Sequence, residues 1–228
     1  MREFNLLDGY PKPSKPRYVG ENIRTIKNRI ISGYRDKNFF DGDRNFGYGG
    51  FNYDGRWKKV AKKIIDEYKL KNSSSFLQLN CEKGFLLNDV KDALPESEVF
   101  GFETSEYAVS TAMEKVKKNI KKVDNYLNLL SQDKSFDFIM ALGVIYVHSL
   151  SDAIKCLKEI QRVGKGKSFI TLASYNNNED YWLFKDWTVL GTTILKKEEW
   201  VEVLKHVNYT GDYFFTNAET LNLKRLNK

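Results

Sequence analysis

Apolar residues in the last three quarters of the chain follow two alternating patterns. Short continuous apolar runs predict buried strands at 76–79, 98–102, 136–142, 168–173 and 213–215. A weaker run predicts one more strand at 123–127. Between these runs, apolar residues recur every three or four positions and predict helices at 57–68, 84–93, 107–116, 150–163 and 197–207. Strands that alternate with helices imply right-handed crossovers, so we expect an α/β fold with a mainly parallel sheet.

The first 56 residues have a different pattern. Residues 1–20 contain three of the four prolines and predict an extended arm, and isoleucines at helical spacing predict a short amphipathic helix over 21–34. The following segment, FFDGDRNFGYGGFNYDGRW at 39–57, holds five glycines and seven aromatic residues. Such a segment is either a cap that closes over a ligand or a loop that packs its rings on the core. We therefore divide the chain into an N-terminal arm, helix and aromatic lid (1–56) and an α/β domain (57–228).

Composition excludes several classes of protein. An apolar share of 41% in 228 residues is enough to build the core of one domain and excludes a disordered chain. No apolar run approaches the roughly 18 residues that cross a bilayer, and the first residues lack the apolar segment of a secretory signal. We expect a cytoplasmic protein without a membrane partner. Its two cysteines, Cys81 and Cys156, are expected to be reduced thiols, and no metal site is expected.

The net charge of +7 does not by itself indicate a class of binding partner. It comes from 37 basic and 30 acidic residues, and the lysines are spread over several predicted helices, as on ordinary solvated faces. Nucleic-acid binding is therefore disfavoured, and a small-molecule substrate, anionic or not, is the expected partner. A homodimer is the assembly we consider.

Candidate ligand-binding residues follow the first two predicted strands of the sheet. Ligands of open parallel sheets bind at the carboxyl ends of the strands. Here the first strand leads through a turn, Leu79 to Gly84, into a helix whose N-terminus favours an anionic group. The second ends in Glu103, 19 residues after Gly84 (103 minus 84), and a carboxylate there can accept hydrogen bonds from both hydroxyls of a ribose.

Four segments in succession resemble the motifs of class I S-adenosylmethionine-dependent methyltransferases. They are FLQLNCEKGFLL, VFGFETSEYAVSTA, SFDFIMALGVIYVHSL and LKEIQRVGKGKSFITLASY. The flanking FFDGDRNFGYGGFNYDGRW and EEWVEVLKHVNYTGDYFF resemble an uncharacterised bacterial subgroup of these proteins. The resemblance implies a Rossmann-like, mainly parallel seven-stranded sheet and S-adenosylmethionine as the cofactor. It implies that the donor contacts Asn80, Cys81, Gly84, Glu103, Thr104, Asp124, Asn125 and Ala141, with Tyr48 and Tyr53 from the lid.

The glycine motif of this family is altered here. The family has an acidic residue and two small residues, mostly glycine, where this chain has Gln78, Asn80 and Glu82. Asn adopts left-handed backbone conformations and can replace glycine. The Glu82 carboxylate would either repel the carboxylate of the donor or pair with its ammonium group. The altered motif leaves a second reading open, a catalytically inactive protein of the same fold that serves as a partner-binding subunit.

The catalytic candidates lie after the fourth strand of the domain. Transfer of a methyl group to a hydroxyl needs an aligned oxygen and a base, and His148 and Tyr146 lie where the methyl group would point. A structural role for His148 is the competing interpretation. Substrate candidates are residues that follow the fifth strand and arginines of the aromatic segment, in which a guanidinium can bind a phosphate or carboxylate: Tyr175, Trp187, Arg44 and Arg56.

These residues and the resemblance together predict an O-methyltransferase that acts on a small polar metabolite. The resemblance to the bacterial subgroup implies an intermediate of surface-glycan or sugar modification. An RNA methyltransferase would require basic side chains gathered on the acceptor side. A nicotinamide-dependent oxidoreductase is disfavoured because the turn from Asn80 to Gly84 lacks the three glycines of that fold.

Overall fold

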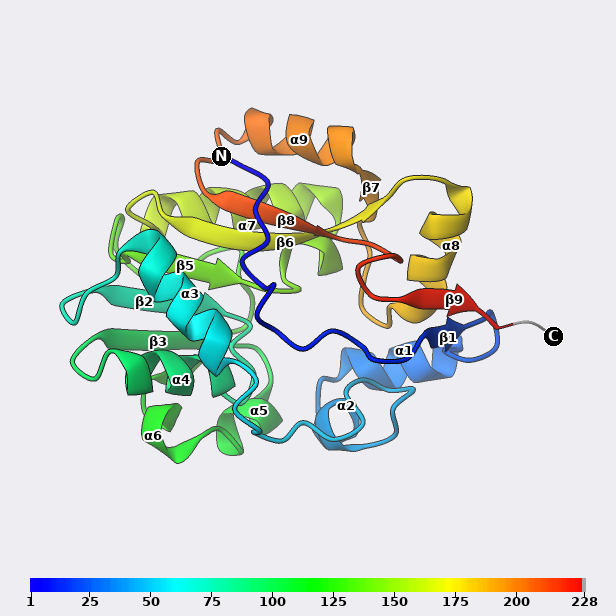
Figure 1. Cartoon of the computed structure of the whole chain (residues 1–228), viewed down its shortest axis with the longest axis horizontal. Helices are drawn as coiled ribbons and strands as arrows, with labels where there is room; N and C mark the ends of the chain where they lie inside the picture. The colour runs from blue at the N-terminus through cyan, green and yellow to red at the C-terminus, as the bar shows by residue number, and fades with distance from the viewer. Residues whose placement is uncertain (227–228) are drawn as a thin grey trace.

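A computed structural model describes residues 1–226 of the chain. Its main sheet has the order β4-β3-β2-β5-β6-β7, with β8 also paired to β6, and every paired strand is parallel to its neighbour (Figure 1). The strands are β2 (Ser75–Leu79), β3 (Glu98–Glu103), β4 (Ile120–Lys122), β5 (Phe138–Ala141), β6 (Ser168–Tyr175), β7 (Leu195–Lys196) and β8 (Asp212–Thr216). The predicted parallel seven-stranded sheet is confirmed.

Helices cover both faces of this sheet because its central strands are apolar on both sides. One face packs against α3 (Lys58–Tyr68) and α4 (Phe85–Ala93) through residues that include Phe76, Phe138 and Phe169. The other packs against α7 (Leu150–Val163) and α9 (Lys197–His206) through residues that include Leu77, Ile139 and Ile170. The short helices α5 (Glu106–Ser110), α6 (Glu114–Lys117) and η1 (Ile145–Val147) lie in connections, and α8 (Asn178–Trp187) follows β6.

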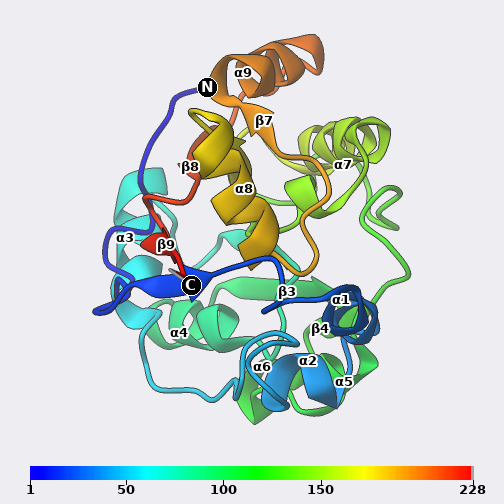
Figure 2. The ribbon, with the colours of Figure 1, turned by 90° about the vertical axis from the view of Figure 1, so that its right-hand side faces the viewer.

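The N-terminal residues extend along the domain to the carboxyl end of the sheet. Leu6 is fully buried, and β1 (Arg17–Val19) pairs with β9 (Leu223–Arg225) as a small parallel sheet. Beyond it, α1 (Ile26–Gly33) and α2 (Lys37–Asp41) lie on the side toward which β5 and β6 point (Figures 1 and 2). The residues that follow α2 pack on α5 and the start of α4, so this segment lies next to the ends of β2 and β3.

Several predicted elements differ from the structure. The helix expected over 107–116 is divided into α5 and α6, and the strand expected at 123–127 is instead β4, three residues earlier. The helix expected over 21–34 begins at Ile26, and Ile26 and Ile30 are 73% and 56% exposed, so its apolar positions do not face the core. The first residues of the aromatic segment belong to α2. The weak apolar periodicity of these short stretches does not determine their ends.

Candidate functional site

The turn after β2 has the backbone of a glycine motif although two of its key residues are not glycine. Asn80, Glu82 and Gly84 have φ angles of 56°, 55° and 75°, all in the left-handed region. Asn tolerates this conformation, whereas Glu82 pays a cost of roughly 1–2 kcal/mol. The Glu82 N–H donates to the Glu103 carboxylate over 2.8 Å, a contact that holds the turn. Every second residue from Asn80 to Gly84 thus has a left-handed backbone, as glycines at these positions would allow.

Gly101 of β3 allows the turn to lie close to the neighbouring strand. A Cβ atom at this position would lie 2.4 Å from the Cys81 sulfur and 2.8 Å from a methyl carbon of Leu87. Only a residue without a side chain fits there. Burial raises the pKa of Cys81 well above its usual value, in agreement with an unreactive thiol that packs beneath the turn.

The carboxylate at the end of β3 is the most highly bonded group of the site. Glu103 is fully buried, and its Oε1 accepts hydrogen bonds from the N–H groups of Thr104 and Ser105, both over 2.8 Å. The same oxygen accepts from Arg35 Nη2 over 3.0 Å, in an ion pair whose arginine side chain is only 18% exposed. Arg35 also donates to Asn80 Oδ1 over 2.7 Å. One guanidinium thus joins the N-terminal segment to the ends of β2 and β3.

The segment that follows α1 is fixed to the turn by further polar contacts. We call residues 35–53 the cap. The Tyr48 hydroxyl donates to Glu82, and the Tyr53 hydroxyl donates to Asp89 Oδ1 on α4 over 2.5 Å. Lys83 donates to Asp41 of the cap over 2.7 Å and to the carbonyl of Phe51 over 3.0 Å. The aromatic segment therefore packs its rings on the domain, as the second interpretation expected, and its closure over a ligand stays a prediction.

Aromatic rings fill the space between the cap and α4. Phe51 lies between Tyr48 and Phe85, with ring centroids 4.3 Å and 4.7 Å away, and Phe40 is fully buried beneath them. Tyr48 is 39% exposed, yet burial by surrounding groups raises the pKa of its hydroxyl well above the usual value. The negative charge of Glu82 contributes to this shift, so the Tyr48 hydroxyl stays protonated at neutral pH and can donate to the Glu82 carboxylate.

Glu82 carries an unusual carboxyl group. Burial raises its pKa from 4.5 to about 7, although the Tyr48 hydroxyl and the charge of Arg35 act in the opposite direction. Between about pH 4.5 and 7, the folded protein therefore binds a proton that the unfolded chain has lost. The stability from this proton is fully present below about pH 4.5 and is lost as the pH rises to 7.

We expect this loss to disappear in Glu82→Gln, whose amide does not titrate. The measurement is the melting temperature of both proteins at pH 5 and pH 8. Wild type should lose stability relative to Glu82→Gln between the two values, because only its carboxyl must ionise in a buried site. If the melting temperatures of the two proteins differ by the same amount at pH 5 and at pH 8, the raised pKa does not belong to Glu82.

Two candidate catalytic residues lie on the connection after β5. Burial raises the pKa of Tyr146 to about 12, so its hydroxyl stays protonated at neutral pH. Burial lowers the pKa of His148, which is therefore mainly neutral, and its Nε2 is buried without a hydrogen-bond partner among the described residues. The His148 carbonyl accepts from Thr193 over 2.6 Å, which fixes the backbone. A neutral imidazole with a free nitrogen is able to accept a proton.

The other residues predicted to contact the methyl donor range from exposed to fully buried. Asp124 is 96% exposed and faces solvent, and Asn125 accepts the N–H of Leu127 over 2.9 Å to form a local turn. Ala141 is fully buried at the end of β5. Tyr126, which we did not predict, is 5% exposed, and its hydroxyl has no hydrogen-bond partner in residues 1–226. Burial and the negative charge of Glu103 raise the pKa of Tyr126 well above its usual value.

The predicted substrate residues are divided between two places. The rings of Trp187 and Tyr146 both contact Phe184, with centroids 5.7 Å and 6.0 Å away, and Tyr175 contacts Tyr181 at 5.2 Å. Arg44 lies in the cap and donates to the carbonyl of Gly47. Arg56 instead pairs with Asp54 and with the hydroxyl of Tyr10 on the exposed surface before α3. Arg56 therefore does not contact Tyr175 or Trp187, the predicted aromatic residues of the substrate site.

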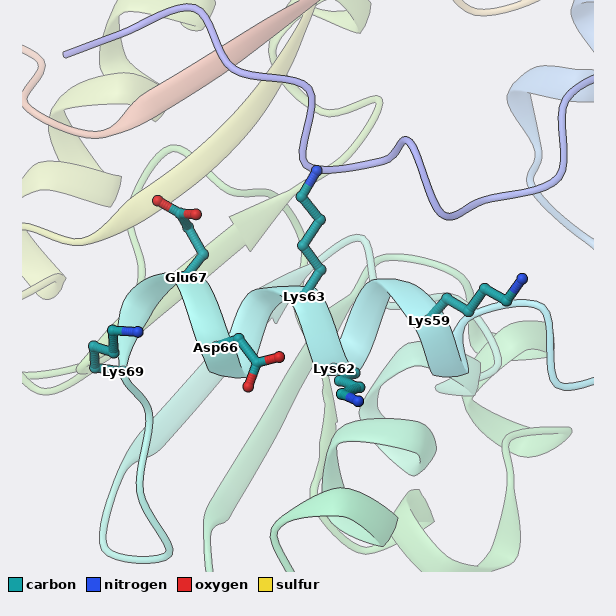
Figure 3. Close-up of a pocket in the computed structure, with 6 residues that line it drawn as sticks. All are labelled: Lys59, Lys62, Lys63, Asp66, Glu67 and Lys69. Atoms are coloured by element: carbon teal, nitrogen blue, oxygen red, sulfur yellow. The ribbon is translucent and has the colours of Figure 1, made fainter.

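One surface hollow lies away from these residues. It has a volume of about 470 Å³ and follows the outer side of α3, where Figure 3 shows its lining residues: Lys59, Lys62, Lys63, Asp66, Glu67 and Lys69. These charged side chains lie along one helix and none belongs to the turn, the cap or the connection after β5. We therefore assign this hollow no part in the site.

Comparison with known proteins now decides the family. Residues 70–213 match the family model described as a methyltransferase domain, and this range includes the turn, Glu103, Tyr146 and His148. The chain belongs to the methyltransferase-domain family. The cofactor of these class I enzymes is S-adenosylmethionine, as the sequence predicted.

Solved structures support the fold of this methyltransferase domain. The YcgJ protein from Bacillus subtilis superposes with a TM-score of 0.53 at 17% identity, over 64% of this chain and 66% of that protein. A protein from Bacillus halodurans named as a candidate methyltransferase has a TM-score of 0.52 at 16% identity, over 64% of this chain and 67% of its own. No curated protein matches the chain.

Within residues 1–226, no helix has both the length and the apolar character that a bilayer crossing requires.

The residues at the strand ends fit S-adenosylmethionine in their backbone and chemistry. The three left-handed residues give the turn the backbone of the family's glycine motif, and Glu103 is a suitable partner for ribose hydroxyls. Its Oε2 accepts only the Glu82 N–H among the described groups, so an acceptor position remains on that oxygen. However, Glu103 has no accessible surface while Arg35 covers it. A ribose can reach this carboxylate only if the Arg35 side chain moves.

Proposed function

We propose that this methyltransferase-domain protein transfers the methyl group of S-adenosylmethionine to a hydroxyl oxygen of a small polar metabolite. The observation that carries the oxygen assignment is the neutral His148 with its free Nε2 on the connection after β5. A hydroxyl acceptor must lose its proton, whereas an amine acceptor can attack through its own lone pair. A surface-glycan or sugar-related intermediate is the kind of acceptor we propose, on the basis of the sequence resemblance.

The donor would be held by the N–H groups of the turn, by Glu103 and by the cap. The turn from Asn80 to Gly84 leads into α4, whose N-terminus favours the donor carboxylate. Glu103 would accept from the ribose after Arg35 moves away, and Tyr48 and Tyr53 would close the site from the cap side. Arg35 would then be free to pair with an anionic group of a ligand.

The chain's own contribution to the chemistry is alignment and removal of a proton. When bound, S-adenosylmethionine supplies a methyl group on a positively charged sulfur. His148 would accept the proton of the acceptor hydroxyl at Nε2, because burial keeps the imidazole neutral at pH 7. Tyr146, which stays protonated, would donate a hydrogen bond that orients the acceptor oxygen.

Replacement of His148 by Gln tests this proposal. The assay follows transfer of a labelled methyl group from the donor to a panel of sugars and other polyhydroxy compounds, with amines as a second panel. We expect kcat to fall about 10²- to 10⁴-fold with a hydroxyl acceptor, because the general base is lost, and the affinity for S-adenosylhomocysteine to stay unchanged.

His206→Gln is the matched control, since this histidine is exposed at the last residue of α9. It should leave kcat unchanged. Undiminished activity of His148→Gln, or transfer to amines but not to hydroxyl compounds in wild type, would contradict the proposed role.

A further inference from the structure

Four arginines of the N-terminal segment lack an acidic partner. The chain has nine arginines, and five of them pair with carboxylates: Arg2, Arg35, Arg56, Arg162 and Arg225. Within residues 1–226, no carboxylate pairs with the other four, which we call the arginine cluster: Arg17, Arg24, Arg29 and Arg44. All four lie in residues 17–44, outside the range that matches the methyltransferase family model.

These four arginines lie close together. Arg24 donates to the main-chain carbonyl of Arg44 over 3.2 Å, and the guanidinium groups of Arg17 and Arg24 both lie over the Trp187 ring. Arg29 donates to the carbonyl of Thr188, the residue after Trp187.

Burial and the positive charges of Arg44, Arg17 and Arg29 lower the pKa of Arg24 to about 10. Burial and the charge of Arg44 also lower the pKa of Arg17. Like charges gathered in a partly buried place destabilise the fold unless an anion neutralises them. The cluster thus has the electrostatic character of an anion-binding site.

Hydrogen bonds to α8 explain the positions of only two members of the cluster. Arg24 donates to the carbonyl of Trp187, and Arg29 donates to the carbonyls of Thr188 over 2.6 Å and Lys185 over 2.8 Å. These bonds satisfy the last carbonyls of α8, where a positive charge is favourable. They do not involve Arg17 or Arg44.

The other two members keep most of their N–H groups available. Arg44 donates to the carbonyl of Gly47 alone, and Arg17 makes no side-chain hydrogen bond in the described part of the chain. Each guanidinium carries five N–H donors in a planar fork that matches the oxygens of a phosphate or carboxylate. The pairing of β1 with β9 and the contact with the Trp187 ring position Arg17, and the N–H donors of its guanidinium remain available to a ligand.

The arginine cluster lies beside the aromatic residues of the proposed acceptor side. The guanidinium carbons of Arg17 and Arg24 are 5.9 Å and 5.5 Å from the centre of the Trp187 ring. Trp187 contacts Phe184, and Phe184 contacts Tyr146 on the connection after β5. Positive charge is thus gathered at one end of a row of aromatic side chains whose other end is the proposed catalytic connection.

We propose that Arg17, Arg24, Arg29 and Arg44 bind a phosphate or diphosphate group of the methyl acceptor, with the Trp187 ring as an adjacent wall. The identification of this anion as part of the acceptor rests on the proposed function. Four guanidinium groups without a carboxylate match two or more negative charges better than the single charge of a carboxylate. The acceptor class is therefore a small phosphorylated metabolite, with the phosphate remote from the methylated hydroxyl.

Calorimetric titration of the full chain with inorganic pyrophosphate tests the site. We expect binding by wild type and at least a tenfold loss of affinity in both Arg17→Gln and Arg44→Gln, neither of which removes a hydrogen bond to α8. Arg2→Gln, which alters a guanidinium paired with Glu67 and Asp212, is the matched control and should bind pyrophosphate as wild type does. No binding by wild type, or equal binding by all variants, would overturn the proposal.

Two further titrations separate the possible sources of failure. Malonate and citrate replace pyrophosphate in one arm, and either one binding as tightly as pyrophosphate would overturn the assignment to phosphate. S-Adenosylhomocysteine is titrated into the same proteins in the other arm, and its affinity should not change in Arg17→Gln. If pyrophosphate binds and S-adenosylhomocysteine does not, the anion site stands and the proposed function fails.

Discussion

Replacement of Glu103 by Gln is expected to lower the affinity for S-adenosylhomocysteine by about 100-fold and the free energy of unfolding by roughly 3–5 kcal/mol. The carboxylate accepts from backbone N–H groups on both oxygens and pairs with Arg35. Gln has one acceptor oxygen, so its NH₂ group would face a backbone N–H, and Arg35 would lose its counter-charge. The affinity loss follows because two ribose hydroxyls require acceptors at this position.

Glu98→Gln is the control for this substitution, because Glu98 is exposed at the opposite end of the same strand. Glu98→Gln should change neither the affinity for S-adenosylhomocysteine nor the free energy of unfolding. Chemical denaturation gives the stability, and calorimetric titration gives the affinity. Unchanged affinity in a folded Glu103→Gln protein would remove Glu103 from the donor site.

Replacement of Phe40 by Ala is expected to cost roughly 3–5 kcal/mol in the stability of the cap. Phe40 is fully buried, and its ring lies against Phe39, Tyr48, Phe51 and Tyr107. The cavity that Ala leaves would weaken the attachment of residues 35–53 to the turn and to α5. Hydrogen exchange of the cap amides should become faster, while exchange in β2 and β5 changes less.

Tyr34→Ala is the matched control, because Tyr34 is an aromatic residue just before the cap and is 72% exposed. Its exchange pattern should match that of wild type. Uniform acceleration in the whole chain after Phe40→Ala would show that the cap is not a separate cooperative unit.

The sequence predicted the sheet well because apolar periodicity and strand length agree there. Ile139 and Ile170 lie in runs that are apolar on both faces, a pattern that only a central parallel strand satisfies. Helix α8 was missed, although Asn177 caps it and Asp180 lies in its first turn, because its residues contain no clear apolar period. Short strands such as β7 and β9 depend on partners distant in the sequence, and local patterns do not reveal them.

The site was predicted where it depends on local conformation. The prediction that Asn80 takes a left-handed conformation is confirmed by its φ angle, and Glu82 does the same. The role of Arg35 was missed because its partner Glu103 is 68 residues away and no local motif connects them. The unpartnered hydroxyl of Tyr126 was not predicted, since a buried tyrosine usually indicates core.

The turn with Asn80 and Glu82 in place of glycine is expected to bind the methyl donor. Calorimetric titration of the wild-type chain with S-adenosylhomocysteine tests this binding without knowledge of the acceptor. We expect one site with a dissociation constant in the micromolar range, on the order of 10⁻⁶ to 10⁻⁵ M. No heat of binding at millimolar ligand would contradict it and would favour a methyltransferase fold that serves as a partner-binding subunit.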